Sequence, residues 1–339
     1  MKKIQYLLLG TMLMCCQLIK GQDVHFSQYM QAPLLINPAL TGMMDGSHRV
    51  LLNYKSQWTS LGAPYKTMGF SYDTHILQNT TRSGSYLGMG LLAFKDQAGD
   101  SKLGQTQVNA SLSGVIKVNE INALSVGIQC GYAQRSISLD NLKWGNQYDG
   151  SNYNSNLPSN EVNGFNAYSF ADVNAGAVWQ YRKDQETFAE GNSFSKFDVG
   201  ISVAHLTKPI QKYYDLEETL NRKLVVHAST EFDVKGSRAA IIPSIVYIRQ
   251  GVLKELVAGA MVKYKINQRT SKYTRAGKTS SLYASIQMRM KDAIIPMLMY
   301  EREGYAIGMS YDFNSSGLNT VSSGRGGYEI SLRFIFGKN

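Results

Sequence analysis

The sequence predicts an all-β fold, a transmembrane antiparallel outer-membrane β-barrel of about 14 strands. Three observations predict it. Apolar and polar residues alternate over segments of about 10 to 14 residues, an export signal opens the chain, and no later apolar run reaches the 18 residues typical of a membrane helix. Strands of soluble sheets most often have about 5 to 6 residues, whereas a tilted membrane strand needs about 9 to 11.

The first 21 residues have the layout of a secretory signal peptide. Two lysines form a basic start, an apolar run follows from Tyr6 to Cys16, and Gly21 precedes the polar Gln22. The apolar run is too short to cross a bilayer as a helix, which takes about 20 residues. We therefore expect cleavage after Gly21, which leaves one cysteine, Cys130. A buried N-terminal helix is the alternative interpretation of this segment.

The alternation is clearest between residues 105 and 118. One face carries mainly apolar side chains from Val108 to Val118, and the other carries glutamine, asparagine and serine from Gln105 to Ser113. An amphipathic helix would instead place apolar residues at three- and four-residue steps. One face therefore suits lipid and the other suits a water-filled lumen.

Fourteen segments show this pattern, and an even count is what a single-chain bacterial barrel requires. Two of them, 238–249 and 292–301, alternate poorly, because each contains a continuous apolar pair. The predicted strands lie near 48–58, 65–75, 86–95, 104–117, 121–133, 168–182, 196–206, 223–233, 238–249, 254–265, 279–290, 292–301, 304–314 and 326–336.

Aromatic side chains recur near the ends of these segments. Amphipathic rings favour the depth of the membrane interface, so we expect two aromatic belts there. The aromatic-ended last segment also resembles the final strand that barrel assembly machinery recognises. The predicted belt residues are Tyr54, Trp58, Tyr72, Phe94, Tyr132, Trp179, Tyr181, Tyr311, Phe313, Phe334 and Phe336.

The expected organisation is a signal peptide (1–21), an N-terminal segment (22–47) and an outer-membrane barrel (48–339). Pro33 and Pro38 stiffen the N-terminal segment, because the residue before a proline is pushed towards extended conformations. We expect this segment to enter the barrel as a plug, or to lie in the periplasm and face partners there. A disordered leader is the third possibility.

The loops fall into two sets if both ends of the barrel lie in the periplasm. The connection 134–167 is the longest and is expected on the extracellular side, together with 207–221 and 314–326. Long loops without secondary structure of their own are usually functional.

Nothing in the sequence indicates catalysis, a cofactor or a metal site. The histidines show no i, i+4 pair and no cysteine pair beside them. His205 and His227 fall on adjacent predicted strands and could meet, with a hydrogen-bonded structural role as the expectation. Ser193 and Lys196 fit an S-x-x-K pattern, but they precede a strand and do not start a helix.

The basic charge does not indicate nucleic-acid binding. The net charge is +10, and it falls to +7 without the three lysines of the signal peptide. A nucleic-acid site would concentrate this charge in a patch, whereas here lysine and arginine are scattered. A basic lumen, or contact with anionic outer-membrane lipid, explains the charge better.

Several stretches resemble the PorP/SprF family of the type IX secretion system. They are QDVHFSQYMQAPLLINPALTG (22–42), LKWGNQYDG (142–150), VGISVAHLTKP (199–209), IPSIVYIRQG (242–251), DAIIPMLMYE (292–301) and the C-terminal IGMSYDFNSSGL…GRGGYEISLRFIF (307–336). They cover the mature chain in family order. The resemblance implies an outer-membrane protein, localised by signal-peptide-directed export, that serves protein secretion and gliding motility.

The resemblance also implies partners. An SprF-like member would help deliver a secreted cargo such as an adhesin, bind its C-terminal domain and hold it at the cell surface, while periplasmic secretion or motility components would be further partners. In the long loop Trp144, Tyr148 and Tyr153 are the predicted partner-binding residues, because exposed aromatics are frequent hot spots. Packing of the loop onto itself is the alternative role. A passive diffusion porin and a barrel enzyme with its site at the rim are the alternative functions.

Overall fold

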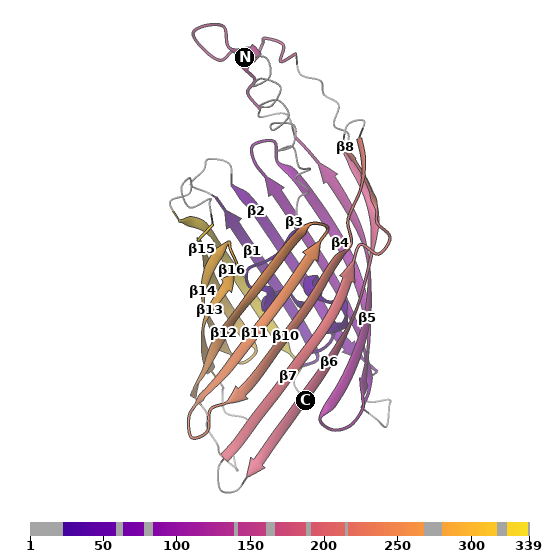
Figure 1. The fold of residues 1–339 in the computed structure, drawn as a ribbon, viewed down its shortest axis with the longest axis vertical. Coiled ribbons are helices and arrows are strands. Elements are labelled where there is room, and N and C mark those ends of the chain that lie inside the picture. The colour runs from indigo at the N-terminus through magenta and orange to yellow at the C-terminus, as the bar shows by residue number, and fades with distance from the viewer. Residues whose placement is uncertain are drawn as a thin grey trace, which may run out of the picture.

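The computed structural model describes residues 23–58, 64–77, 84–138, 142–160, 167–187, 191–213, 216–267, 280–316 and 324–337. Fourteen antiparallel strands form one closed barrel, and a separate two-stranded hairpin stands at one of its ends (Figure 1). The predicted fold class and strand count are confirmed. Within the described residues, no helix has the length and apolar character needed to cross a membrane.

The barrel strands follow one another in chain order around the ring, and the hairpin β8–β9 interrupts that order between β7 and β10. The barrel strands are β1 (His48–Gln57), β2 (Tyr65–Ile76), β3 (Tyr86–Ala98), β4 (Leu103–Lys117), β5 (Asn122–Ser136), β6 (Tyr168–Thr187), β7 (Gly191–Ala204), β10 (Lys223–Asp233), β11 (Ala239–Gln250), β12 (Leu253–Asn267), β13 (Ser280–Arg289), β14 (Ala293–Arg302), β15 (Tyr305–Asn314) and β16 (Arg325–Phe336). The hairpin strands are β8 (Ile210–Tyr213) and β9 (Leu216–Thr219).

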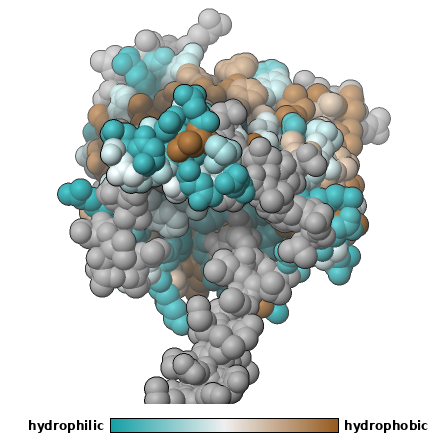
Figure 2. Space-filling view, turned by 90° about the horizontal axis from the view of Figure 1, so that it is seen from above, coloured by the Kyte–Doolittle hydropathy of each residue, from teal (hydrophilic) through white to brown (hydrophobic). Residues whose placement is uncertain are grey.

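The ring closes where β1 pairs with β16, in continuous antiparallel register from His48 opposite Phe336 to Gln57 opposite Gly327. The chain therefore enters and leaves the barrel at the same end, which we call the terminus end. The opposite end carries the segment between β5 and β6 and the β8–β9 hairpin, and we call it the loop end. Figure 2 looks onto the loop end, where teal, hydrophilic residues face the viewer near the middle.

The wall shows the two-residue alternation directly. On β5 the outward Val126 is 64% exposed, whereas its neighbour Ser125 points inward and is buried. Outward apolar side chains without protein cover are what a lipid-facing wall requires. The alternation that predicted the strands therefore reports the two environments of the barrel.

Some details of the sequence-based prediction were wrong. Phe94 was expected in an aromatic belt, but it lies in the inward phase of β3 and is buried. The segment 207–221 connects β7 to β10 at the loop end, and it contains the β8–β9 hairpin, which was not predicted because its strands are too short to show a clear period. Strand β6 extends to Thr187, beyond the predicted end at residue 182.

The two poorly alternating segments are strands β11 and β14. Their apolar pairs arise because inward positions there are apolar as well. Ile242 on β11 and Met297 on β14 belong to an apolar cluster inside the barrel. The predicted water-filled lumen is therefore replaced on this side by packed side chains, which are Ile242, Met261, Tyr283, Met297, Met299 and Ala306.

Residues 23–47 run through the lumen, and we call them the strap. Asp23 lies at the loop end, where its backbone N–H donates to the side chain of Gln250, the last residue of β11. At the terminus end, the N–H of Ser47 donates to the carbonyl of Phe336. Three short helical pieces shape the strap, η1 (Tyr29–Gln31), α2 (Pro33–Ile36) and η2 (Pro38–Leu40). Their indigo ribbon lies inside the ring of strands in Figure 1.

Candidate functional site

The beginning of the strap is held by ionisable groups of the wall. Glu329 of β16 is 1% exposed and accepts the backbone N–H of Ser27 at 2.7 Å and of Gln28 at 3.0 Å. The Ser27 hydroxyl donates to Asp312 at 2.7 Å and accepts from Arg289 at 2.7 Å. Hydrogen bonds to ionised groups are about twice as strong as neutral ones. These contacts fix the strap against β13, β15 and β16.

The middle of the strap is held by neutral groups. The Asn37 side chain donates to the carbonyls of Ala177 and Ile201, each at 3.2 Å, and lies 3.1 Å from Nε2 of His227. Its Oδ1 accepts the N–H of Ala39 at 2.9 Å. Because Asn37 is fully buried, each of these bonds replaces one to water that burial removes. Asn37 therefore joins β6 and β7 to the strap.

Inward-facing glycines give the strap room. A Cβ on Gly127 of β5 would lie 2.5 Å from backbone atoms of Pro38, and one on Gly88 of β3 would lie 2.3 Å from the carbonyl oxygen of Thr41. No side chain fits at such distances, and backbone atoms of a buried turn cannot move aside without repacking. The wall is therefore shaped to the strap.

The end of the strap is fixed by a buried ion pair. Asp73 of β2 accepts the N–H of Gly42 at 2.8 Å and pairs with Arg49 of β1 at 2.7 Å. Arg49 also donates to the carbonyl of Leu40 at 3.2 Å. The pair thus satisfies a donor and an acceptor of the strap at once, close to the point where β1 begins.

At the loop end the strap starts in a cluster of charges. His205, just after β7, pairs with Asp23 through Nε2, and its Nδ1 lies 2.9 Å from the carboxylate of Asp172. Lys223 lies 3.1 Å from Asp23. Burial opposes the charged imidazole, but the adjacent carboxylates of Asp172 and Asp23 outweigh it and raise the pKa of His205. The imidazolium is thereby the form that holds Asp23.

This cluster predicts a pH dependence. A histidine whose pKa is raised in the folded state stabilises it fully below the unfolded pKa of about 6.5, and that contribution is lost as pH rises through the raised value. Between about pH 6 and pH 9 we expect wild type to lose more resistance to urea than His205→Gln does. Urea titrations of the purified barrel at both pH values measure this. Equal losses in the two proteins would contradict the charged histidine.

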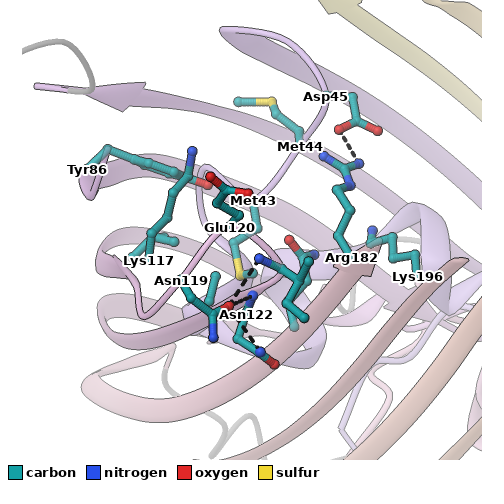
Figure 3. A pocket seen from close by; sticks show the side chains of 14 residues that line it. Met43, Met44, Asp45, Tyr86, Lys117, Asn119, Glu120, Asn122, Arg182 and Lys196 are labelled. Atoms are coloured by element: carbon teal, nitrogen blue, oxygen red, sulfur yellow. Dashed lines mark hydrogen bonds and ion pairs between the residues drawn. The ribbon is translucent and has the colours of Figure 1, made fainter. Parts of the chain in front are cut away.

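A polar cavity of about 180 Å³ opens at the terminus end (Figure 3). The strap contributes Met43, Met44 and Asp45, and the wall contributes Lys117, Asn119, Glu120, Arg182 and Lys196. Figure 3 shows the guanidinium of Arg182 directed at Asp45, with which it forms an ion pair. The last residues of the strap thus share one surface with the turn between β4 and β5.

The structure places the three predicted partner-binding residues in a loop folded on itself. Tyr148 and Tyr153 form an isolated antiparallel bridge, and Tyr148 is 58% exposed. Trp144 is half-buried. The buried Gln147 organises this loop, because it accepts the hydroxyl of Tyr153 at 3.2 Å and donates to the carbonyl of Leu157 at 3.0 Å.

The structure therefore brings Tyr148 and Tyr153 together, with Lys143 5.1 Å from the centre of the Tyr153 ring. Packing of the loop onto itself, the alternative role, accounts for part of its contacts. Tyr148 still presents most of its ring to solvent. The two roles are compatible, because self-packing holds an exposed aromatic side chain in place.

Comparison with known families decides the identity of the chain. The family described as "Type IX secretion system membrane protein PorP/SprF" matches residues 18–334. The chain belongs to this family. The match extends from before the strap to the last strand, so it includes both the wall and the strap. No curated protein matches the sequence significantly.

The PorP/SprF chain is similar in fold to solved barrels at low identity. The Ralstonia pickettii toluene transporter TbuX is 10% identical, with 90% of this chain and 94% of that chain covered and a TM-score of 0.45. The P. putida toluene transporter TodX is 10% identical, with 90% and 94% covered and a TM-score of 0.43. BamA from Haemophilus ducreyi lacking POTRA domains 1–3 is 9% identical, with 86% and 70% covered and a TM-score of 0.40.

Sequence reasoning did not single out the residues that hold the strap. Glu329 and Asp73 looked like ordinary polar positions of their strands. A signal existed at the glycines, because Gly88 and Gly127 occupy inward positions where other strands carry serine or asparagine. Glycine in a strand interior often marks the close approach of another backbone. Inward glycines of this kind could have predicted a segment of polypeptide packed against the wall inside the lumen.

Proposed function

We propose that this PorP/SprF barrel supports secretion and surface attachment of a type IX cargo, such as an adhesin, by binding its C-terminal domain at the loop end. Family membership carries the proposal, because it assigns the chain to the type IX secretion system. The signal peptide 1–21 directs export, and the start of β1 and the end of β16 face the periplasm, as in other single-chain barrels. The loop end then faces the outside of the cell.

The filled lumen favours this function over a passive diffusion porin. Buried strap residues such as Leu34, Asn37 and Thr41 occupy the space that a porin leaves to water. We propose that the strap acts as a plug. The terminus end, with the cavity beside Asp45 and Arg182, is the surface we assign to periplasmic secretion or motility components.

The long loop is the surface we assign to the cargo. Tyr148 is a large, exposed aromatic side chain on a self-supported loop, which is the setting in which interface hot spots occur. We expect shortening of residues 142–157 to lower surface-retained adhesin about tenfold or more, since one hot spot contributes about 2 kcal/mol or more. Antibody labelling of adhesin on intact cells measures retention.

Two single substitutions at the loop end make this test more specific. Tyr148→Ala should lower retention, whereas Ile210→Ala should not, although Ile210 is 51% exposed on the hairpin at the same end. Barrel abundance must be equal in all strains. Full retention of adhesin by the shortened loop at normal barrel abundance would reject this loop as the cargo site.

A further inference from the structure

The strap is held in two different ways along its length. Residues 37–42, which we call the anchor, bond to uncharged groups except at Leu40 and Gly42, which contact the buried Arg49–Asp73 pair. The hydroxyl of Ser113 donates to the carbonyl of Thr41 at 2.6 Å, and that of Ser125 donates to the carbonyl of Ala39 at 2.6 Å. Thr41 and Ala39 are both fully buried.

The anchor also leaves no room for water between itself and the wall. The strand backbone approaches it so closely that even one added carbon on Gly176 of β6 would lie 2.1 Å from Oδ1 of Asn37. Water entry is what lowers the cost of breaking a buried hydrogen bond. Where water cannot enter, opening has to break several bonds and contacts together. The anchor therefore opens only with the barrel.

Residues 23–31, which we call the arm, are held mainly by charges. Glu329 holds two of its N–H groups, and Asp312 and Arg289 hold the Ser27 hydroxyl. Arg289 lies 3.2 Å from Asp312, so these two opposite charges stay paired when the arm leaves. Glu329 loses both of its N–H donors, and water that enters the vacated lumen has to replace them. Release of the arm therefore hydrates one carboxylate and breaks no ion pair between these wall residues.

The join between the two parts is not a continuous helix. Ala32 lies between η1 and α2 with φ −137° and ψ 53°, outside the helical region, and Pro33 follows it. A short piece with such a break can rotate at one residue without unwinding its neighbours. The arm also points away from the anchor, because Asp23 lies at the loop end and the anchor lies nearer the terminus end.

We infer that the strap consists of a fixed anchor and a releasable arm, and that the arm leaves the lumen on the loop-end side when a polypeptide partner binds there. The second half of this inference rests on the proposed function. The arm begins beside the loop end, where Lys223 and His205 hold Asp23. A charged partner surface competes for those same two cations. Partner binding is thereby coupled to opening of the lumen.

Amide hydrogen exchange of the full-length barrel in detergent micelles tests this. The amides of Ser27 and Gln28, and those of Ala39 and Gly42, are all hydrogen-bonded, so differences in exchange report local opening. We expect the arm amides to exchange at least about tenfold faster than the anchor amides. Equal exchange of the two parts would overturn the division into arm and anchor.

Two variants separate the arm from a general loosening of the barrel. Glu329→Gln should speed exchange in the arm and leave the anchor unchanged. Glu231→Gln is the matched control, because Glu231 is another inward carboxylate, 2.8 Å from Lys263, with no strap contact among the described residues. Faster exchange in the anchor of Glu329→Gln would overturn the inference.

The coupling is tested by adding the purified C-terminal domain of the adhesin. We expect it to speed exchange of the arm several-fold and to leave the anchor unchanged. If the domain binds and the arm does not respond, the coupling is refuted while the proposed function stands. If the domain does not bind but the arm still exchanges faster than the anchor, the proposed function fails and so does the coupling, whereas the division of the strap stands.

Discussion

Removal of the strap is expected to convert the barrel into an open channel. When residues 23–45 are replaced by a Gly/Ser linker of equal length, uptake of large antibiotics such as vancomycin should rise about tenfold or more, because a ring of this many strands encloses more space than its own side chains fill. The buried residues Leu34, Asn37 and Thr41 supply the mass that fills that space in the wild type.

Growth inhibition by vancomycin, and single-channel conductance of the purified protein, both measure this change. The linker keeps the signal peptide and the spacing to β1, so export is unaffected. Barrel folding is checked by the heat-dependent gel shift of the same samples. A folded, abundant variant with unchanged uptake and no steady conductance would show that the strap is not the plug.

Substitution of one wall glycine is expected to have an effect of similar size with the strap sequence intact. Gly127→Val adds a side chain at a position where the Cβ alone would lie 2.5 Å from backbone atoms of Pro38. Overpacking of this kind lowers the free energy of unfolding by about 1–3 kcal/mol or more. Here the clash is relieved only if the anchor moves away from β5. We expect a lower urea midpoint and a gain in antibiotic uptake.

Gly114→Val is the matched control for this variant. Gly114 lies on the neighbouring strand β4 in the outward phase, and an added Cβ there would meet no atom closer than 3.9 Å. The two variants make the same chemical change in adjacent strands of one wall. Equal urea midpoints and equal uptake in both would mean that the anchor seat does not depend on Gly127.

The strand ring could be predicted from the sequence because lipid and lumen impose the same two-residue period on every strand. The apolar Val126 faces outward and the polar Ser125 faces the lumen, so residue type alone indicates the side on which each residue lies. The prediction weakened where the lumen itself is apolar, as around Ile242 and Met297, because both faces of the strand then look alike. Phe94 was assigned to the wrong side for a related reason, because a phenylalanine suits both an apolar position inside the barrel and the aromatic belt.

The strap contacts could not be predicted in the same way, because they join residues far apart in sequence with no shared period. Glu329 and Ser27 are 302 residues apart, and nothing local to either residue indicates the other. The two prolines indicate a stiff segment, from which the sequence predicts either a plug or a periplasmic segment, with a disordered leader as the third possibility. The residues that hold the segment could be identified only once the closed ring was known, because closure brings β1, β6, β7 and β16 around the same lumen.

Closure of the ring also fixes an order of events in assembly. A segment lying along the axis of a closed cylinder cannot pass sideways through hydrogen-bonded walls, and end-on entry would drag Asp23 and its neighbours the full length of the bore. The strap must therefore be seated while β1 and β16 are still apart. Pairing of β1 with β16 is then the last step of barrel closure, and the sheet closes around the strap that precedes β1.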